Sequence, residues 1–152
     1  MNLFKKIMDV NVMGSMYVAK YASVAMSKNE PVNERGEKGV IIFVSSVAAD
    51  EGQRGQVGYG ASKGAINGAV LPMARDLGKY GIRVVAIAPG VFATPIGAGA
   101  PQQIIDSLRK MSPMNRFGQP DEFAHFVRTI IENSYLNGVH LKLSGAQVIG
   151  HM

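Results

Sequence analysis

The sequence predicts an α/β fold built on a parallel sheet, and three observations indicate this class. Short runs of β-branched and aliphatic residues at 40–44 and 83–88 are typical of strands buried on both faces. Longer segments with apolar residues at helical spacing lie between and around these runs. Serines or a Pro-Gly pair follow each run directly, which places polar groups at one edge of the sheet. The 152 residues fit a single domain, which we assign to residues 1–152.

The first element is predicted to be one long helix over residues 2–27, because its apolar residues form a broad stripe. Asn11 falls in the middle of this helix, where asparagine is neutral to unfavourable. On residue type alone, the preferred interpretation of Asn11 is an amide that faces solvent or bonds within the helix. Residues 28–39 are charged and contain Pro31 and two glycines, which indicates an exposed loop.

The run Val40–Val44 is expected to form a central parallel strand. Polar side chains appear abruptly at Ser45 and Ser46, where the strand ends. Open α/β sheets bind their ligands in a crevice at this edge, so a hydroxyl there is a candidate binding group.

A largely buried helix is predicted over residues 59–77, with Tyr59 and Lys63 in its first turns. The spacing of four residues puts both side chains on one face, about 5 to 6 Å apart at their Cβ atoms. A nearby positive charge favours a phenolate, so Lys63 would tune Tyr59. If Ser46 reaches the same point, one hydroxyl can polarise a carbonyl oxygen while the phenol exchanges a proton with it. This is carbonyl/alcohol redox chemistry, provided that a hydride carrier is present.

The remaining elements follow the same pattern. Residues 83–88 form a second buried strand, which Pro89-Gly90 ends at the edge that carries Ser46. A short helix over 101–110 lies in a Gly- and Pro-rich segment that is either a mobile lid or a static loop. A helix over 121–133 is expected to be capped by Asp121, and 139–143 forms the last strand. His125 lacks a partner at metal-ligand spacing, so it is interpreted as structural and no metal site is predicted.

Composition limits the function classes. The net charge of +5 fits an anionic partner such as a CoA phosphate or RNA, but the basic residues are scattered and a solvated surface is the simpler interpretation. The absence of cysteine excludes disulfides and thiolate chemistry. The apolar runs are shorter than the ~18 to 20 residues of a membrane span, so we expect a soluble intracellular protein.

The residues quoted above resemble a known family. Ser46, followed by Tyr59 and Lys63 in Tyr-Gly-Ala-Ser-Lys, resembles the serine and Tyr-x-x-x-Lys signature of the short-chain dehydrogenases/reductases. Three further matches occur in family order. They are Asn11-Val12-Met13-Gly14, Ala88-Pro89-Gly90 with Thr94-Pro95, and Asn137-Gly138 before the last strand.

The resemblance implies a role for each matching residue. Tyr59 would be the acid/base, Lys63 would tune it and hold the cofactor ribose, and Ser46 would polarise the carbonyl. Asn11 would hold a water against the lysine and complete a proton relay. The residues implied to contact the nicotinamide carboxamide of NAD are Pro89, Gly90, Val91 and Thr94. A simple strand-ending turn explains Pro89-Gly90 but not Thr94-Pro95.

Stretches such as SVAADEGQ and APGVFATP look like one branch of the family, the type-2 3-hydroxyacyl-CoA dehydrogenases. That branch implies an acyl-CoA or steroid substrate, with Gln53 beside it, although Gln53 is equally well explained as a polar loop residue. It also implies a mitochondrial location, a dimer or tetramer, and an RNA-processing assembly as a possible partner. Ser144 departs from the branch, which typically has an aspartate there. The small residues at spacings of four on the helix after Tyr59 suit either a dimer interface or packing on the chain's own sheet.

The glycine-rich turn and later acidic residue that hold a dinucleotide are missing from the sequence. We therefore expect the C-terminal portion of a Rossmann-type doubly wound sheet, without its N-terminal dinucleotide-binding strands. Such a chain is expected to be inactive alone. The alternative is a non-catalytic subunit that pairs with a full-length dehydrogenase or with an RNA-processing assembly.

Overall fold

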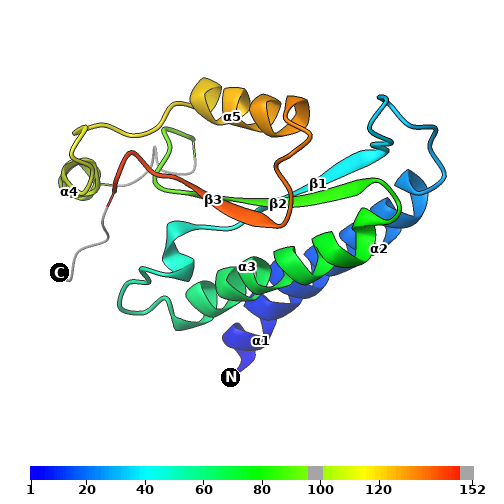
Figure 1. Cartoon of the computed structure of the whole chain (residues 1–152). Coiled ribbons are helices and arrows are strands. Elements are labelled where there is room, and N and C mark those ends of the chain that lie inside the picture. The colour runs from blue at the N-terminus through cyan, green and yellow to red at the C-terminus, as the bar shows by residue number, and fades with distance from the viewer. Residues whose placement is uncertain (96–100, 148–152) are drawn as a thin grey trace.

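The computed structural model describes residues 1–95 and 101–147. Figure 1 shows a sheet with helices on both faces, which confirms the predicted α/β class. One face is covered by α1 (Asn2–Met8), α2 (Ser15–Met26) and α3 (Val57–Gly78), and the other by α5 (Pro120–Glu132). Helix α4 (Gln102–Lys110) lies beyond one end of the sheet.

The sheet holds three parallel strands in the order β1 (Gly39–Val44), β2 (Ile82–Pro89) and β3 (Val139–Leu143). Strand β2 is buried from Ile82 to Ala88, because helices cover both of its faces. The expectation that Val40–Val44 is a central strand buried on both faces is wrong for this structure. Among the described residues β1 pairs only with β2, and 51% of Val44 is exposed.

Two apolar clusters fill the layers. The cluster below the sheet joins Ile41 and Phe43 of β1 to Ile66 and Val70 of α3. The cluster above it joins β2 to Ile130 of α5. Helix α3 buries only one stripe, spaced by four residues at Ser62, Ile66, Val70 and Ala74. The prediction of a largely buried helix is therefore wrong, since the sheet covers just one side of α3.

The helix predicted over 2–27 is confirmed, since residues 2–26 are helical throughout, with a π-helical turn, η1 (Asp9–Gly14), that contains Asn11. One further helix prediction needs correction. Helix α5 is capped by Gln119 rather than Asp121. The reason is that Pro120 occupies the first turn, and the Gln119 backbone N–H donates to the Glu122 carboxylate at 2.7 Å.

A buried ion pair fastens the opposite, amino edge of the sheet. The Arg83 guanidinium donates to Glu37 at 2.7 Å, and to the backbone oxygens of Ile130 and Leu136 at 3.0 and 2.9 Å. These bonds join the loop before β1 to β2 and to the end of α5. No local sequence pattern predicts these bonds, because Glu37 and Arg83 are 46 residues apart.

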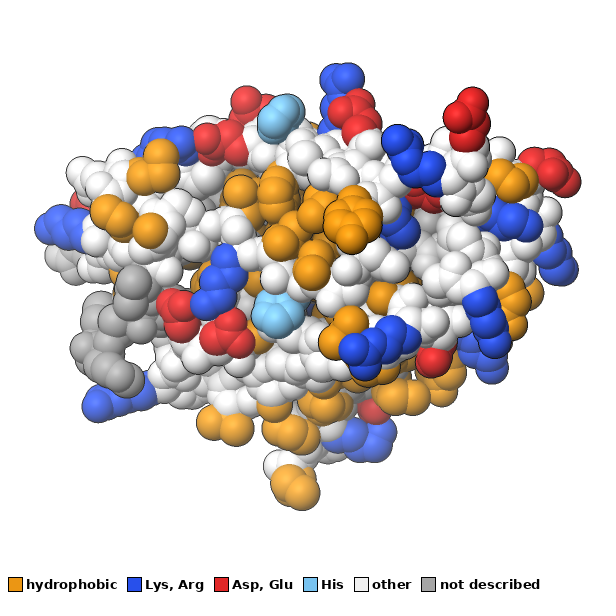
Figure 2. All heavy atoms as spheres, in the orientation of Figure 1, with side chains coloured by type: hydrophobic (Ala, Val, Ile, Leu, Met, Phe, Trp, Pro, Cys, Tyr) orange, Lys and Arg blue, Asp and Glu red, His pale blue; other side chains and the backbone are white. Residues whose placement is uncertain are grey.

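Figure 2 shows positive and negative side chains interspersed over one face of the molecule, which agrees with the scattered charge of the sequence. Hydrophobic side chains gather along the lower edge of this view, where α1 lies. Within the described part of the chain, no helix combines the length and apolar character that crossing a membrane requires.

Candidate active site

The carboxyl ends of the three strands meet at one edge of the sheet. Val44 pairs with Ile87, and Pro89 pairs with Leu143, so the segments that follow β1, β2 and β3 leave the sheet together. The 3₁₀ helix η2 (Val47–Ala49) and the start of α3 lie at this edge as well (Figure 1). A Cβ atom on Gly60 would stand only 2.9 Å from the Ala48 carbonyl oxygen, so the first turn of α3 rests directly on η2.

The two serines after β1 have different surroundings. Ser45 is buried, and its hydroxyl donates to the Lys63 carbonyl oxygen at 3.2 Å. Its backbone N–H donates to the Ile87 oxygen at 2.7 Å, which continues the sheet by one residue. Ser46 is half-buried and caps η2, because its hydroxyl oxygen accepts the Ala48 N–H at 3.1 Å. Ser45 thus joins the end of β1 to α3, and Ser46 is the serine that remains available at the candidate site.

Tyr59 and Lys63 lie side by side on α3. The Lys63 Nζ atom is 5.6 Å from the centroid of the Tyr59 ring and donates to the Val44 carbonyl oxygen at 2.8 Å. The ammonium is therefore held between the end of β1 and the phenol. Burial lowers the pKa of Lys63, because the charged form loses solvation there. Tyr59 is 37% exposed.

Asn11 is tied to the same helix through a serine that sequence analysis missed. The Asn11 Nδ2 donates to the Ser62 hydroxyl at 3.0 Å, and that hydroxyl donates to the Tyr59 carbonyl oxygen at 2.7 Å. Ser62 is completely buried. The structure thus directs the Asn11 side chain to Ser62, and the water relay from Asn11 to Lys63 stays a prediction.

The turn after β2 is held by its own neighbours. Gly90 donates to the Leu143 oxygen at 3.0 Å, and Val91 donates to the side-chain oxygen of Gln147 at 2.8 Å. The Val91 oxygen accepts the Gly118 N–H at 3.0 Å. Both backbone groups of Val91 are therefore engaged within the chain. The predicted contacts of Pro89, Gly90, Val91 and Thr94 with a nicotinamide carboxamide stay predictions, and Gln147 is a residue that sequence reasoning missed.

The other predicted residues surround this edge or lie away from it. Gln53 lies in the loop between η2 and α3, where its backbone N–H meets the Gln56 side-chain oxygen at 3.4 Å. Ser144 follows β3 and accepts the Gln147 N–H at 3.1 Å. His125 is exposed on α5. In the described residues no group of three His, Cys, Asp or Glu side chains is placed to hold a metal ion.

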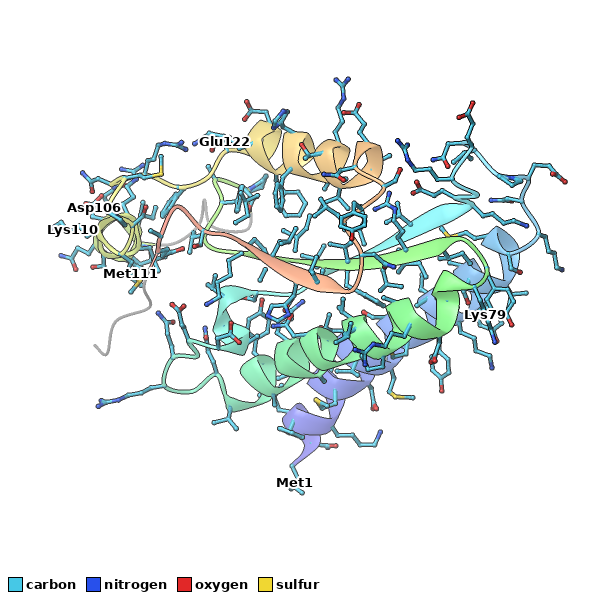
Figure 3. All side chains as sticks on the ribbon, in the orientation of Figure 1. Met1, Lys79, Asp106, Lys110, Met111 and Glu122 are labelled. Atoms are coloured by element: carbon cyan, nitrogen blue, oxygen red, sulfur yellow. The ribbon has the colours of Figure 1, made fainter. Side chains whose placement is uncertain are left out.

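The segment predicted to be a lid is described except at residues 96–100, which lie outside the described part of the chain. Figure 3 shows Asp106, Lys110 and Met111 together at one end of the sheet, with Lys79 of the α3 C-terminus at the opposite end. Helix α4 therefore lies at the end where the strands finish, and its role as a mobile lid stays a prediction.

The chemistry of this donor set fits one end of a nicotinamide cofactor. A partly desolvated ammonium and an exposed phenol are suited to hydrogen bonds with ribose hydroxyls, and the turn after β2 runs past the same strand ends. The sequence lacks the Gly-x-Gly-x-x-Gly pattern of a pyrophosphate-binding turn, and the glycines at 52–60 lead instead to Tyr59. The residues therefore fit the nicotinamide end of the cofactor and not its pyrophosphate.

Comparison with known proteins identifies the family of the chain. The family model described as enoyl-(acyl carrier protein) reductase matches residues 1–145. The 3-hydroxyacyl-CoA dehydrogenase type-2 of Mus musculus is 49% identical over 144 residues, which are 94% of this chain and 55% of the mouse protein. The Homo sapiens protein of the same name is 48% identical with the same coverage. The chain thus spans about half the length of these relatives.

Solved structures agree with the sequence relatives. A 3-hydroxyacyl-CoA dehydrogenase type-2 from Mycobacterium avium superposes with a TM-score of 0.93 at 36% identity, over 100% of this chain and 59% of that one. A 3-oxoacyl-[acyl-carrier protein] reductase from Brucella melitensis gives a TM-score of 0.84 at 31% identity, over 98% of this chain and 54% of that one. The resemblance found in the sequence is confirmed: the chain belongs to the short-chain dehydrogenase/reductase family.

Proposed function

We propose that this chain carries the catalytic part of an NAD-dependent dehydrogenase that interconverts a secondary alcohol and a ketone. The observation that supports the proposal is the position of Lys63, whose ammonium is held by the Val44 oxygen at 2.8 Å and lies 5.6 Å from the Tyr59 ring. Lys63 therefore places a positive charge beside the phenol at the carboxyl edge of the sheet. Among the described tyrosines, Tyr59 alone has a lysine ammonium near its ring and also lies at the carboxyl edge of the sheet.

Each residue has a separate task in this mechanism. Tyr59 takes the proton from the alcohol in the oxidation and returns it in the reduction. Ser46 donates a hydrogen bond to the oxygen of the carbonyl as that oxygen gains charge. Lys63 keeps a positive charge beside the phenol and binds ribose hydroxyls. Asn11 and Ser62 hold the first turn of α3 in place. NAD, when bound, would supply the hydride chemistry.

The substrate class follows from the relatives. Proteins named 3-hydroxyacyl-CoA dehydrogenase type-2 are 48% and 49% identical to this chain, so a 3-hydroxyacyl-CoA is the first substrate to test. The resemblance seen in the sequence adds a hydroxysteroid as the second. Gln53 lies in the loop beside the site and is the candidate polar contact for the substrate. We further propose a mitochondrial homo-oligomer as the working form and an RNA-processing complex as a partner, as the family resemblance in the sequence implies.

The role of Tyr59 is tested in a fusion of this chain with the part of the mouse relative that it does not cover. We expect Tyr59→Phe to lower kcat/KM on acetoacetyl-CoA by a factor of about 10² to 10⁴, because it removes the proton donor. Tyr80→Phe is the matched control. Tyr80 also lies near a lysine, with Lys79 Nζ 5.1 Å from its ring, but at the far end of α3. Full activity of the Tyr59→Phe fusion would contradict the proposal.

A non-catalytic subunit is the second candidate, and the open edge of β1 favours it. That strand pairs with β2 on one side and offers its other side to a partner strand. Titration of the chain alone with NADH separates the two candidates. Tight binding would exclude the purely non-catalytic role. We expect weak binding at most, because the sequence lacks a pyrophosphate turn.

A further inference from the structure

One side chain from the end of β3 holds the turn that follows β2. The Gln147 side-chain oxygen accepts the Val91 N–H at 2.8 Å, and Gln147 is only 5% exposed. The same oxygen lies 2.5 Å from the position that a Cβ atom on Gly90 would take. Gly90 is therefore the residue that lets the Gln147 carboxamide reach the backbone of the turn.

The backbone before Gln147 adopts an unusual conformation to place it there. Gly145 and Ala146 have φ angles of +58° and +56°, and alanine rarely adopts this left-handed region. The Gln147 N–H closes the turn on the Ser144 oxygen at 3.1 Å. Such strain persists only where the surroundings impose it, and it gathers at functional sites.

The same four residues, Ser144–Gln147, also contact the segment that follows α4. Ser112 is 6% exposed, and its hydroxyl donates to the Gly145 oxygen at 2.9 Å. That hydroxyl accepts the Met114 N–H at 3.2 Å. The Ser144–Gln147 turn therefore stands between the turn after β2 and the base of α4, and it bonds to both.

The contacts of Gln147 fix which backbone groups of the turn after β2 remain for a ligand. Gly90 and Val91 donate within the chain, and Ala93 donates to the Gly118 oxygen at 2.9 Å. Phe92 lies between the two residues that bond to Gly118 in this parallel bridge, so its own N–H points the other way. If Gln147 did not hold the Val91 N–H, the backbone could rotate there and the direction of the Phe92 N–H would change.

We propose that Gln147 is a positioning residue for the nicotinamide end of the cofactor. By holding Val91, it sets the orientation in which the turn after β2 presents its remaining polar groups to a carboxamide. This inference rests on the proposed function. It makes Gln147 a residue that acts through the turn, without touching the reacting atoms.

The test compares two variants of the 152-residue chain by NMR. Gln147→Met keeps the length of the side chain and removes the acceptor. Asn137→Leu is the matched control, because the Asn137 side-chain oxygen accepts the N–H of Val84 at 2.8 Å at the other end of β2. Gln147→Glu keeps an acceptor oxygen and serves as the rescue variant. Gln147→Asn, whose oxygen stops one carbon short, replaces Gln147→Met if that variant does not fold.

Two quantities are measured for each variant. We expect Gln147→Met to speed amide exchange at Val91 by about tenfold or more, and Asn137→Leu to speed it only at Val84. We expect the shift changes caused by nicotinamide mononucleotide to need a severalfold higher concentration in Gln147→Met alone. The concentration of ADP-ribose, which has no nicotinamide ring, that is needed to cause shift changes should be the same in Gln147→Met as in the unmodified chain. Gln147→Glu should restore both properties of the turn.

Unchanged exchange at Val91 in Gln147→Met would overturn the proposal, as would equal weakening of mononucleotide binding in Asn137→Leu. Failure of the unmodified chain to respond to the mononucleotide would instead overturn the cofactor role of the whole site. The exchange measurement would then decide separately whether Gln147 orders the turn.

Discussion

Single buried polar residues connect the candidate site to the rest of the chain. Ser62 is the clearest case, since its hydroxyl accepts from Asn11 and donates to the Tyr59 carbonyl oxygen, with no solvent to replace either bond. A buried polar group that loses its partner costs the free energy of its desolvation. The position of Tyr59 therefore depends on a residue that takes no part in the proposed chemistry.

We predict that Ser62→Ala lowers the free energy of unfolding by about 1–3 kcal/mol, because it leaves the Asn11 amide without its acceptor. Ser15→Ala is the control. The Ser15 hydroxyl also contacts Asn11, but it donates to the backbone oxygen at 2.8 Å within the helix. Its loss should change the unfolding free energy by about 0.5 kcal/mol or less. Urea unfolding measures both, and equal effects would show that the Asn11–Ser62 bond contributes little.

Local patterns explain which elements of the structure were predicted from the sequence. The strand at 40–44 follows from an uninterrupted apolar run, and the structure places it at 39–44. The last strand, 139–143, contains His140 and Lys142 and is predicted from the family resemblance at Asn137-Gly138, and the structure places it at 139–143. The pattern also placed Ser46, Tyr59 and Lys63 at one edge, because strand ends and helical spacing are local properties. The π turn at Asn11 was not predictable, since apolar spacing does not mark one extra residue in a helix turn.

The bonds that connect elements were missed for a different reason. Asn11 and Ser62 are 51 residues apart, and Val91 and Gln147 are 56 apart. No local pattern specifies such pairs, because they form only once the sheet brings the segments together. The cap of α5 was misplaced by two residues because Pro120 can occupy the first turn of a helix, which moves the cap to Gln119.

The packing of α3 on η2 leads to a prediction at the scale of elements. A Cβ atom at Gly60 would lie 2.9 Å from the Ala48 oxygen, whereas one at Gly64 would lie 4.0 Å from the Ala49 oxygen. We expect Gly60→Ala to lower stability by about 1–3 kcal/mol, because backbone must move. Gly64→Ala should raise stability by up to about 1 kcal/mol, since alanine favours a helix. Thermal unfolding of both variants checks this, and stabilisation by both would show that α3 does not rest on η2.

Across the whole molecule, the amino edge of the sheet is held by Glu37 and Arg83, whose side chains are 10% and 7% exposed. Burial alone would raise the pKa of Glu37, but hydrogen bonds from Arg83, Ser134 and Asn33 outweigh it and lower that pKa below 4.5. The unfolded chain therefore binds this proton more tightly. The stability that the pair contributes is complete above pH 4.5 and is lost as the pH falls through the lower pKa of the folded state.

We predict that Glu37→Gln destabilises the chain at neutral pH by about 3 kcal/mol, because Arg83 keeps its charge in a buried place. The variant should also lose less stability than the unmodified chain as the pH is lowered below 4.5. Glu34→Gln, an exposed change in the same loop, should alter neither quantity. Chemical unfolding at a series of pH values measures both, and parallel curves for Glu37→Gln and the unmodified chain would contradict the assignment.

The open edge of β1 governs the behaviour of the chain in solution. Beside this edge lies an apolar groove of about 540 Å³ between β1 and α2, lined by Val18, Ala22, Ile42 and Val44 among others. An unpaired apolar edge of this kind is a template for pairing with another strand. In a solution of this chain alone, the available partner is a second copy.

We predict concentration-dependent self-association that a lysine in the groove weakens. Val18→Lys places a charge at the wall of the groove, where burial against a second copy would cost its solvation. Val32→Lys makes the same change in the loop before β1, and the two valines are similarly exposed, at 69% and 71%. Sedimentation velocity should show a lower average mass for Val18→Lys and no change for Val32→Lys. A monomeric unmodified chain, or equal masses for both variants, would show that copies do not meet at the β1 edge.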